Sequence, residues 1–186
     1  MTAPTLTPHF RDFLPGWLAR QPWYLGQGVP SIAPAGFFRL EDPAGAVGIE
    51  THLVGAASHV YQIPMTYRGA PLPDADPAAL ICTAEHSELG PRWIYDAVRD
   101  PVWTAALTRL VAEEGQAEGR GGGRARGLRS ASWREDAAAT IDLIRVLAGG
   151  PAVGGPGVLG VVMGSWRPGG GDAAPAEGCL AVLRAG

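Results

Sequence analysis

The sequence predicts an α+β domain in which an antiparallel sheet carries helices packed on one of its faces. Apolar residues recur with helical spacing after residue 10 and again after residue 101. Several runs between and beyond these segments alternate with a period of two, as strands do. A helix laid across an antiparallel sheet buries both kinds of apolar face. The composition, with 46% hydrophobic and 18% charged residues among 186, is that of a globular protein.

The first helix is expected near the start of the chain, and its apolar stripe occupies positions i, i+3, i+4, i+7 and i+8. These positions hold Phe10, Phe13, Leu14, Trp17 and Leu18. Pro15 lies inside the stripe and has no backbone donor. We therefore expect a kink or a restart of the helix at this proline.

A short strand is expected at residues 35–40, followed by an antiparallel hairpin. Residues 47–54 alternate with period two, a turn follows at 55–58, and residues 61–68 alternate again. Pro64 cannot donate a hydrogen bond to a neighbouring strand, so it predicts a sheet edge or a bulge at that point.

A second hairpin and the clearest helix start follow. Residues 80–88 and 92–96 read as two strands. Asp100 can cap a helix and Pro101 suits its first position, so a helix should begin there and end near Gly115.

The chain divides by composition into three parts. Residues 1–114 hold the elements above, and residues 115–133 are rich in glycine and arginine, which indicates a flexible linker. Residues 134–186 are expected to form a C-terminal β extension. Its strand-like runs are residues 139–147, 157–166 and 178–184.

Charge and composition exclude several classes of function. The net charge is −3, so neither nucleic acid nor an anionic membrane is an expected partner. No apolar run reaches about 18 residues, the length that spans a bilayer. All basic residues are arginine, which excludes a Schiff-base or phosphate-binding lysine. Cys82 and Cys179 lie outside any CxxC pattern and no secretion signal precedes them, so we expect free thiols in the cytoplasm.

The sequence predicts no catalytic residues, no metal site and no cofactor. The four histidines lack the spacing of metal ligands. Glu85, His86 and Ser87 would alternate between the two faces of a strand, so a Ser–His pair cannot form there without a bend. Asp96 and Asp100 could share a cleft, but a structural role is favoured, with Asp96 paired to Arg92 or Arg99.

Aromatic and polar residues of the two hairpins are the candidate binding site. A flat ring can face the C–H bonds of a sugar while nearby polar groups bind its hydroxyls. The alternative is that these rings belong to the core, with their polar tips at its rim. The candidate residues are Trp23, Tyr24, Tyr67, Arg68, Glu85, His86, Trp93 and Asp96.

Four sequence blocks carry a resemblance to a known family. They are QPWYLG (21–26), GAVGIETHLV (45–54), HVYQIPMTYRG (59–69) and EHSELGPRWIYDAVRDPVW (85–103). Over residues of about 10 to 112 the chain resembles the N-terminal cap domain of actinobacterial maltokinases. The resemblance implies a cystatin-like fold, in which a curved antiparallel sheet carries helices.

The resemblance does not imply kinase activity. In maltokinases other lobes bind ATP, magnesium and maltose and make maltose 1-phosphate, and none of their motifs matches this chain. The chain is more similar to stand-alone cap-like proteins, some of them labelled glucan-branching proteins. A branching enzyme needs a barrel of about 250 residues. Ser165-Trp166 fits the end of such stand-alone proteins, so we expect a complete protein.

Two hypotheses of function follow. The first is a non-catalytic accessory or binding protein of α-glucan or maltose/trehalose metabolism, acting through a protein partner or a homodimer. A sheet edge at Pro64 or in the C-terminal strands would serve it. The second is a small-ligand binding protein or small enzyme, with a sugar or sugar phosphate held between sheet and helices. A kinase is the third and least favoured alternative, because the sequence lacks the motifs that bind nucleotide phosphates.

Overall fold

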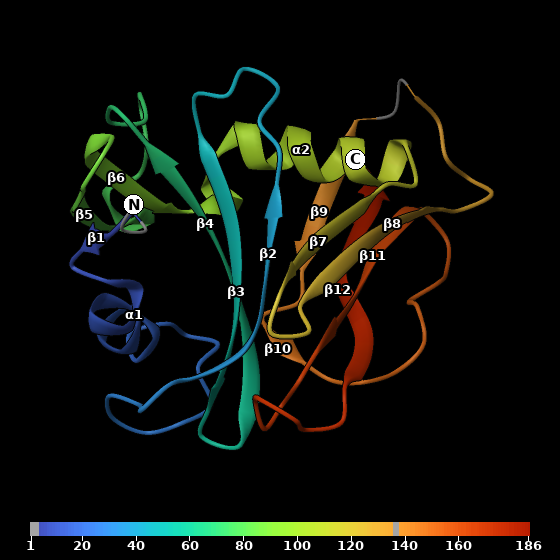
Figure 1. The fold of residues 1–186 in the computed structure, drawn as a ribbon. Helices are drawn as coiled ribbons and strands as arrows, with labels where there is room; N and C mark the ends of the chain where they lie inside the picture. Colours follow the sequence, from blue (N-terminus) through green and yellow to red (C-terminus); the bar gives the residue numbers. More distant parts are fainter. Residues whose placement is uncertain (1–3, 136–137) are drawn as a thin grey trace.

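The computed structural model describes residues 4–135 and 138–186 (Figure 1). Residues 1–3 and 136–137, which belong to the predicted parts 1–114 and 134–186, lie outside the described residues. The helical elements are α1 (Phe10–Leu18), η1 (Pro77–Ala79), η2 (Ala97–Arg99) and α2 (Pro101–Ala112). The strands are β1 (Leu6–Thr7), β2 (Ala33–Leu40), β3 (Gly48–Ala56), β4 (His59–Arg68), β5 (Leu80–His86), β6 (Gly90–Asp96), β7 (Gln116–Arg120), β8 (Arg124–Arg129), β9 (Ala139–Leu143), β10 (Val146–Leu147), β11 (Val158–Trp166) and β12 (Ala176–Ala185).

All described strands join one antiparallel sheet, which confirms the predicted α+β class. Their hydrogen-bonded order is β1-β5-β6-β4-β3-β2-β7-β8-β11-β12-β9, and β10 pairs with β4. Figure 1 shows β2, β3 and β4 in one half of the molecule and β7, β8, β11 and β12 in the other, with α2 across the same end of both. The predicted hairpins are confirmed as β3–β4 and β5–β6.

The run 139–147 ties the two halves of the sheet together. Its first part, β9, pairs with β12, and its second part, β10, pairs with β4. The buried amide of Gln62, on β4, donates to the carbonyl oxygens of Ile144 at 3.0 Å and Leu180 at 2.9 Å. One glutamine therefore donates both to the segment between β9 and β10 and to β12.

Helix α2 begins as predicted. The Asp100 side chain accepts a hydrogen bond from the Val102 nitrogen at 3.0 Å, and Pro101 occupies the first turn. Helix α1 is capped by His9 and Asp12, and it continues through Pro15 to Leu18. No restart occurs at the proline.

The prediction of a flexible linker at 115–133 is wrong, because these residues contain the hairpin β7–β8. Three of its glycines, Gly119, Gly123 and Gly127, lie where a side chain would clash with the neighbouring backbone. A Cβ at Gly119 would be 1.6 Å from the Phe37 carbonyl oxygen, and one at Gly127 would be 2.1 Å from that of Leu110. Glycine here permits close backbone approach.

Pro64 is buried and lies on β4 between the residues that pair with β10 and those that pair with β6. The predicted exposed sheet edge at Pro64 is therefore absent. Residues 60–61 pair with β10 and residues 65–68 pair with β6. The backbone nitrogen of Gln62 donates toward the β10 side, to the Arg145 carbonyl, so the nitrogen of Pro64 faces that same side. The proline therefore fills the position between the two partner strands, where no donor is needed.

The sheet buries apolar side chains on both faces. One core lies between the two halves and α2, and it joins buried residues from both sides of 115–133, such as Phe38, Leu53, Leu159 and Leu180. A second core lies between α1 and the outer face of β3, β4 and β6. The two helices α1 and α2 therefore pack on opposite faces of the sheet, and the prediction that they share one face is wrong. Among the described residues no helix is long and apolar enough to cross a membrane.

Candidate functional site

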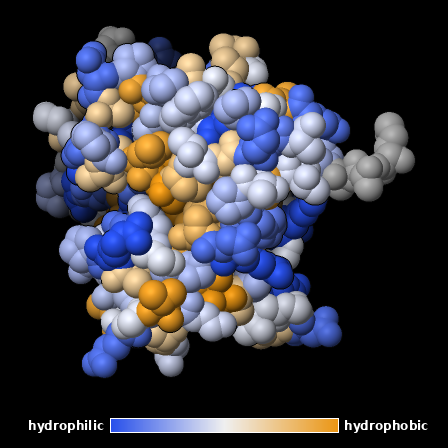
Figure 2. Space-filling view, turned by 90° about the vertical axis from the view of Figure 1, so that its left-hand side faces the viewer, coloured by the Kyte–Doolittle hydropathy of each residue, from blue (hydrophilic) through white to orange (hydrophobic). Residues whose placement is uncertain are grey.

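A groove with a volume of about 1280 Å³ lies on the outer face of β2, β3 and β4. The segment before α1 and the turn at residues 41–47 border it. Figure 2 looks onto the side of the molecule that carries β1, β5 and α1, and shows apolar patches there between strongly hydrophilic side chains. Such a mixed surface suits a polar ligand with apolar faces.

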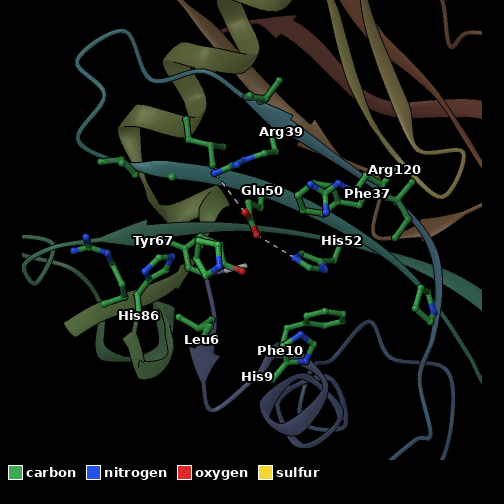
Figure 3. Close-up of a pocket in the computed structure, with 18 of the residues that line it drawn as sticks. Leu6, His9, Phe10, Phe37, Arg39, Glu50, His52, Tyr67, His86 and Arg120 are labelled. Atoms are coloured by element: carbon green, nitrogen blue, oxygen red, sulfur yellow. Dashed lines mark hydrogen bonds and ion pairs between the residues drawn. The ribbon is translucent and has the colours of Figure 1, made fainter. Parts of the chain in front are cut away.

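Glu50 lies at the centre of the groove and is paired with Arg39 and His52 (Figure 3). Its Oε1 lies 3.5 Å from a guanidinium nitrogen of Arg39, and its Oε2 lies 3.4 Å from Nε2 of His52. Arg39 and Glu50 are direct partners in the β2–β3 register, and His52 follows two residues later on the same face of β3.

Two aromatic rings flank the imidazole of His52. The Phe10 ring centroid lies 4.4 Å from that of His52, with the planes inclined at 47°. The Phe37 ring meets His52 edge-to-face at 5.1 Å. The ring centroid of His9 lies 4.3 Å from that of Phe10, so His9, Phe10, His52 and Phe37 form a continuous row of rings. The groove thus places ring surfaces next to hydrogen-bonding groups.

Tyr67 lies beside Glu50 in the same groove (Figure 3). Burial raises the pKa of the Tyr67 hydroxyl well above its ordinary value, and the charge of Glu50 raises it further, so it stays protonated as a donor. Burial alone would raise the pKa of Glu50. Hydrogen bonds from His52 and Tyr67 and the charge of Arg39 outweigh burial, so this pKa is lowered and the carboxylate stays ionised at neutral pH.

A comparison with known protein families identifies the part of the chain that carries the groove. Residues 17–100 match the family model of the maltokinase N-terminal cap domain. The chain carries a maltokinase N-terminal cap-like domain. The groove strands β2, β3 and β4 lie entirely within the matched residues. Phe10 and Arg120, which also line the groove, come from segments before and after the match.

The groove of the cap-like domain contains two of the eight predicted binding residues, Tyr67 and His86. Strand alternation and register place three others, Arg68, Glu85 and Trp93, on the opposite face of β4, β5 and β6. Glu85 is exposed there. The sheet therefore separates residues that the sequence grouped together.

Arg68 binds Asp100 and does not reach the groove. Its Nε and one terminal nitrogen donate to the two carboxylate oxygens of Asp100, each at 2.7 Å. The Asp100 side chain is fully buried and also caps α2. The pair holds the start of α2 to the end of β4.

Trp23, Tyr24 and Asp96 lie in a different cluster of the cap-like domain. The guanidinium carbon of Arg145 lies 4.8 Å from the Trp23 ring centroid, and Arg145 also forms an ion pair with Asp96. Both Trp23 and Tyr24 pack near Tyr61. Asp96 is therefore paired with Arg145, and the predicted pairing with Arg92 or Arg99 is wrong because Arg145 arrives through the β10 run.

Sequence reasoning missed the central residues Phe10, Phe37, Glu50 and His52. A signal for the last two was present, because Glu50 and His52 are two apart on one strand and so share a face. No local pattern could place Phe10 and Phe37 beside them, because these contacts join α1, β2 and β3. In the part of the chain that the structure describes, no group of three or more His, Cys, Asp or Glu residues could hold a metal ion.

Proposed function

We propose that the chain is a non-catalytic, cytoplasmic accessory protein of α-glucan or maltose/trehalose metabolism that binds a saccharide in the groove. Its cystatin-like sheet carries the site, and its C-terminal β extension braces that sheet through β10. The observation that supports the proposal best is His52, which pairs with Glu50 and lies between the rings of Phe10 and Phe37. The free state of Cys82 and Cys179 is consistent with a reducing compartment.

The chemistry of a saccharide matches this arrangement. Pyranose rings present C–H faces, which pack on aromatic rings, and hydroxyls, which hydrogen-bond to charged side chains. Phe10 and Phe37 supply rings, while Arg39, His52 and Glu50 supply polar groups within the same groove. The volume of about 1280 Å³ exceeds that of common small-ligand pockets, so a short oligosaccharide would fit.

Isothermal titration calorimetry with glucose, maltose and maltotriose tests the proposal. We expect maltotriose to bind, and Phe37→Ala to weaken binding about tenfold, which corresponds to about 1.4 kcal/mol. Val29→Ala is a matched control, because Val29 is 70% exposed and lies outside the groove. The absence of heat with all three sugars, or an equal loss in both variants, contradicts the proposal.

A second candidate is self-association through the end of the sheet. Strand β9 is the last strand in the hydrogen-bonded order, and terminal strands offer unpaired backbone groups to a second chain. Thr140 and Asp142 are its exposed residues. Light scattering on the wild-type chain and on Thr140→Pro would detect a dimer and its loss. A wild-type monomer at all concentrations would rule this candidate out.

A further inference from the structure

The groove contains more hydrogen-bond donors than free acceptors. Four arginines line it, although the chain as a whole carries a net charge of −3. These are Arg11, Arg39, Arg92 and Arg120. Each guanidinium has five N–H donors and no acceptor. Arg39 uses one terminal nitrogen on Glu50, and its side chain is 59% exposed, so donors remain available to a ligand.

Two of the acidic side chains in the groove are already engaged. Glu50 is paired with Arg39 at 3.5 Å and with His52 at 3.4 Å. The carboxylate of Asp42 accepts hydrogen bonds from the backbone nitrogens of the following turn, at distances between 2.9 and 3.0 Å. A carboxylate offers about four acceptor positions. Asp42 has little acceptor capacity left, Glu50 is already paired with two side chains, and the third acid, Glu41, lies on the exposed turn at the border.

The hydrogen bonds of two histidines also leave a donor for a ligand. Nδ1 of His86 accepts from the backbone nitrogens of Glu88 and Leu89, both at 3.2 Å. Nδ1 of His9 accepts from the Arg11 nitrogen at 3.4 Å. A ring nitrogen that accepts carries no proton, so in the neutral ring Nε2 carries it. Both histidines line the groove, and in the neutral ring the Nε2–H group is the donor that a ligand can use.

From this excess of donors we infer that the saccharide bound in the groove carries an oxyanion, and that its class is a phosphorylated sugar. The inference rests on the proposed function and adds the charge of the ligand to it. A neutral hydroxyl needs an acceptor as well as a donor, and the arginines and histidines that line the groove outnumber its three carboxylates. A phosphate group accepts only, and guanidinium groups bind it with paired, charge-assisted hydrogen bonds.

Calorimetry with glucose 6-phosphate, glucose and inorganic phosphate tests the inference, since the first two differ by one phosphate. We expect glucose 6-phosphate to bind at least tenfold more tightly than either of the other two. Its affinity should fall as the salt concentration rises, because exposed charges are screened. Arg39→Gln and Arg92→Gln should each weaken glucose 6-phosphate binding at least fivefold, and by a larger factor than they weaken glucose binding. Arg126→Gln, an exposed arginine of β8 outside the groove, is the matched control.

The outcomes separate the inference from the proposed function. Equal or tighter binding of glucose overturns the inference and leaves saccharide binding intact. Inorganic phosphate binding as tightly as glucose 6-phosphate shows a plain anion site and overturns the inference. No binding of glucose 6-phosphate, with maltotriose still bound, overturns the inference alone. No binding of any sugar contradicts both. An equal loss of affinity for glucose 6-phosphate in the Arg126→Gln control would overturn the inference, because the charge of the whole chain, and not the groove, would then govern binding.

Discussion

Replacing Asp100 by alanine should destabilise the fold by about 4 kcal/mol. Breaking a buried ion pair by removing one partner costs about 3–5 kcal/mol. Because the Arg68 side chain keeps 18% of its exposure, the lower end of that range applies. Loss of the α2 cap adds about 1 kcal/mol. Urea denaturation followed by tryptophan fluorescence measures the sum.

A double-mutant cycle separates the two contributions. Asp100→Asn keeps a capping side chain and removes the charge, so it should cost less than Asp100→Ala. Arg68→Met combined with Asp100→Ala should recover part of the loss, because no unpaired charge then remains buried. A cost below about 1 kcal/mol for Asp100→Ala, as for an exposed pair, would refute the reasoning.

The Arg68–Asp100 pair also makes the free energy of unfolding depend on pH in the acid range. Burial raises the pKa of Asp100, but the hydrogen bonds from Arg68 and the Val102 nitrogen outweigh burial, so the folded pKa lies below the ordinary 3.8. A lowered folded pKa stabilises the protein fully above the unfolded value. That stability is lost as pH falls from 3.8 through the folded pKa. Wild type should lose more stability than Asp100→Asn over that acid window.

Three further predictions concern the core and the thiols. Gln62→Leu should cost about 1–3 kcal/mol in urea denaturation, because the Ile144 carbonyl loses its donor while the Leu180 carbonyl keeps the Ile144 nitrogen. A cost near zero contradicts this. Gly127→Ala should lower the melting temperature sharply, since its Cβ would lie 2.1 Å from the Leu110 oxygen, whereas Gly154→Ala has no neighbour within 4 Å and should not. Burial raises the pKa of the Cys82 thiol from 9.0 to about 11. In a variant without Cys179, alkylation of Cys82 at pH 8 should therefore be about a hundredfold slower in the folded than in the unfolded chain, because the thiolate is the reactive form. Equal rates in the two states would contradict this.

Much of the fold could be predicted because local chemistry and final structure agree. Asp100 and Pro101 set the start of α2, and period-two alternation gives the β3–β4 hairpin. The β7–β8 hairpin could not be predicted, because the same glycine content suits a flexible segment and a tightly packed strand. Only the structure shows that Gly119 and Gly127 lie against the backbone of β2 and α2.

The binding site was harder to predict because it depends on which face each residue occupies. Tyr67 and Arg68 are neighbours in the sequence, yet strand alternation sends them to opposite faces. Tyr67 joins Glu50 in the groove, while Arg68 is used by Asp100. The missing ring, Phe10, comes from a helix distant in sequence from β3. Composition identified the right kinds of residue, and tertiary packing determined which of them meet.

An NMR titration with maltotriose and glucose 6-phosphate tests the central claim, that the groove is the ligand site of the cap-like domain, most directly. The account predicts chemical-shift changes of the backbone amides concentrated at Phe37, Glu50, His52 and Tyr67. Amides around Trp23 and Arg145, which lie in the separate cluster, should not move. Changes centred on Trp23 and Arg145, or no saturable change anywhere, would contradict it.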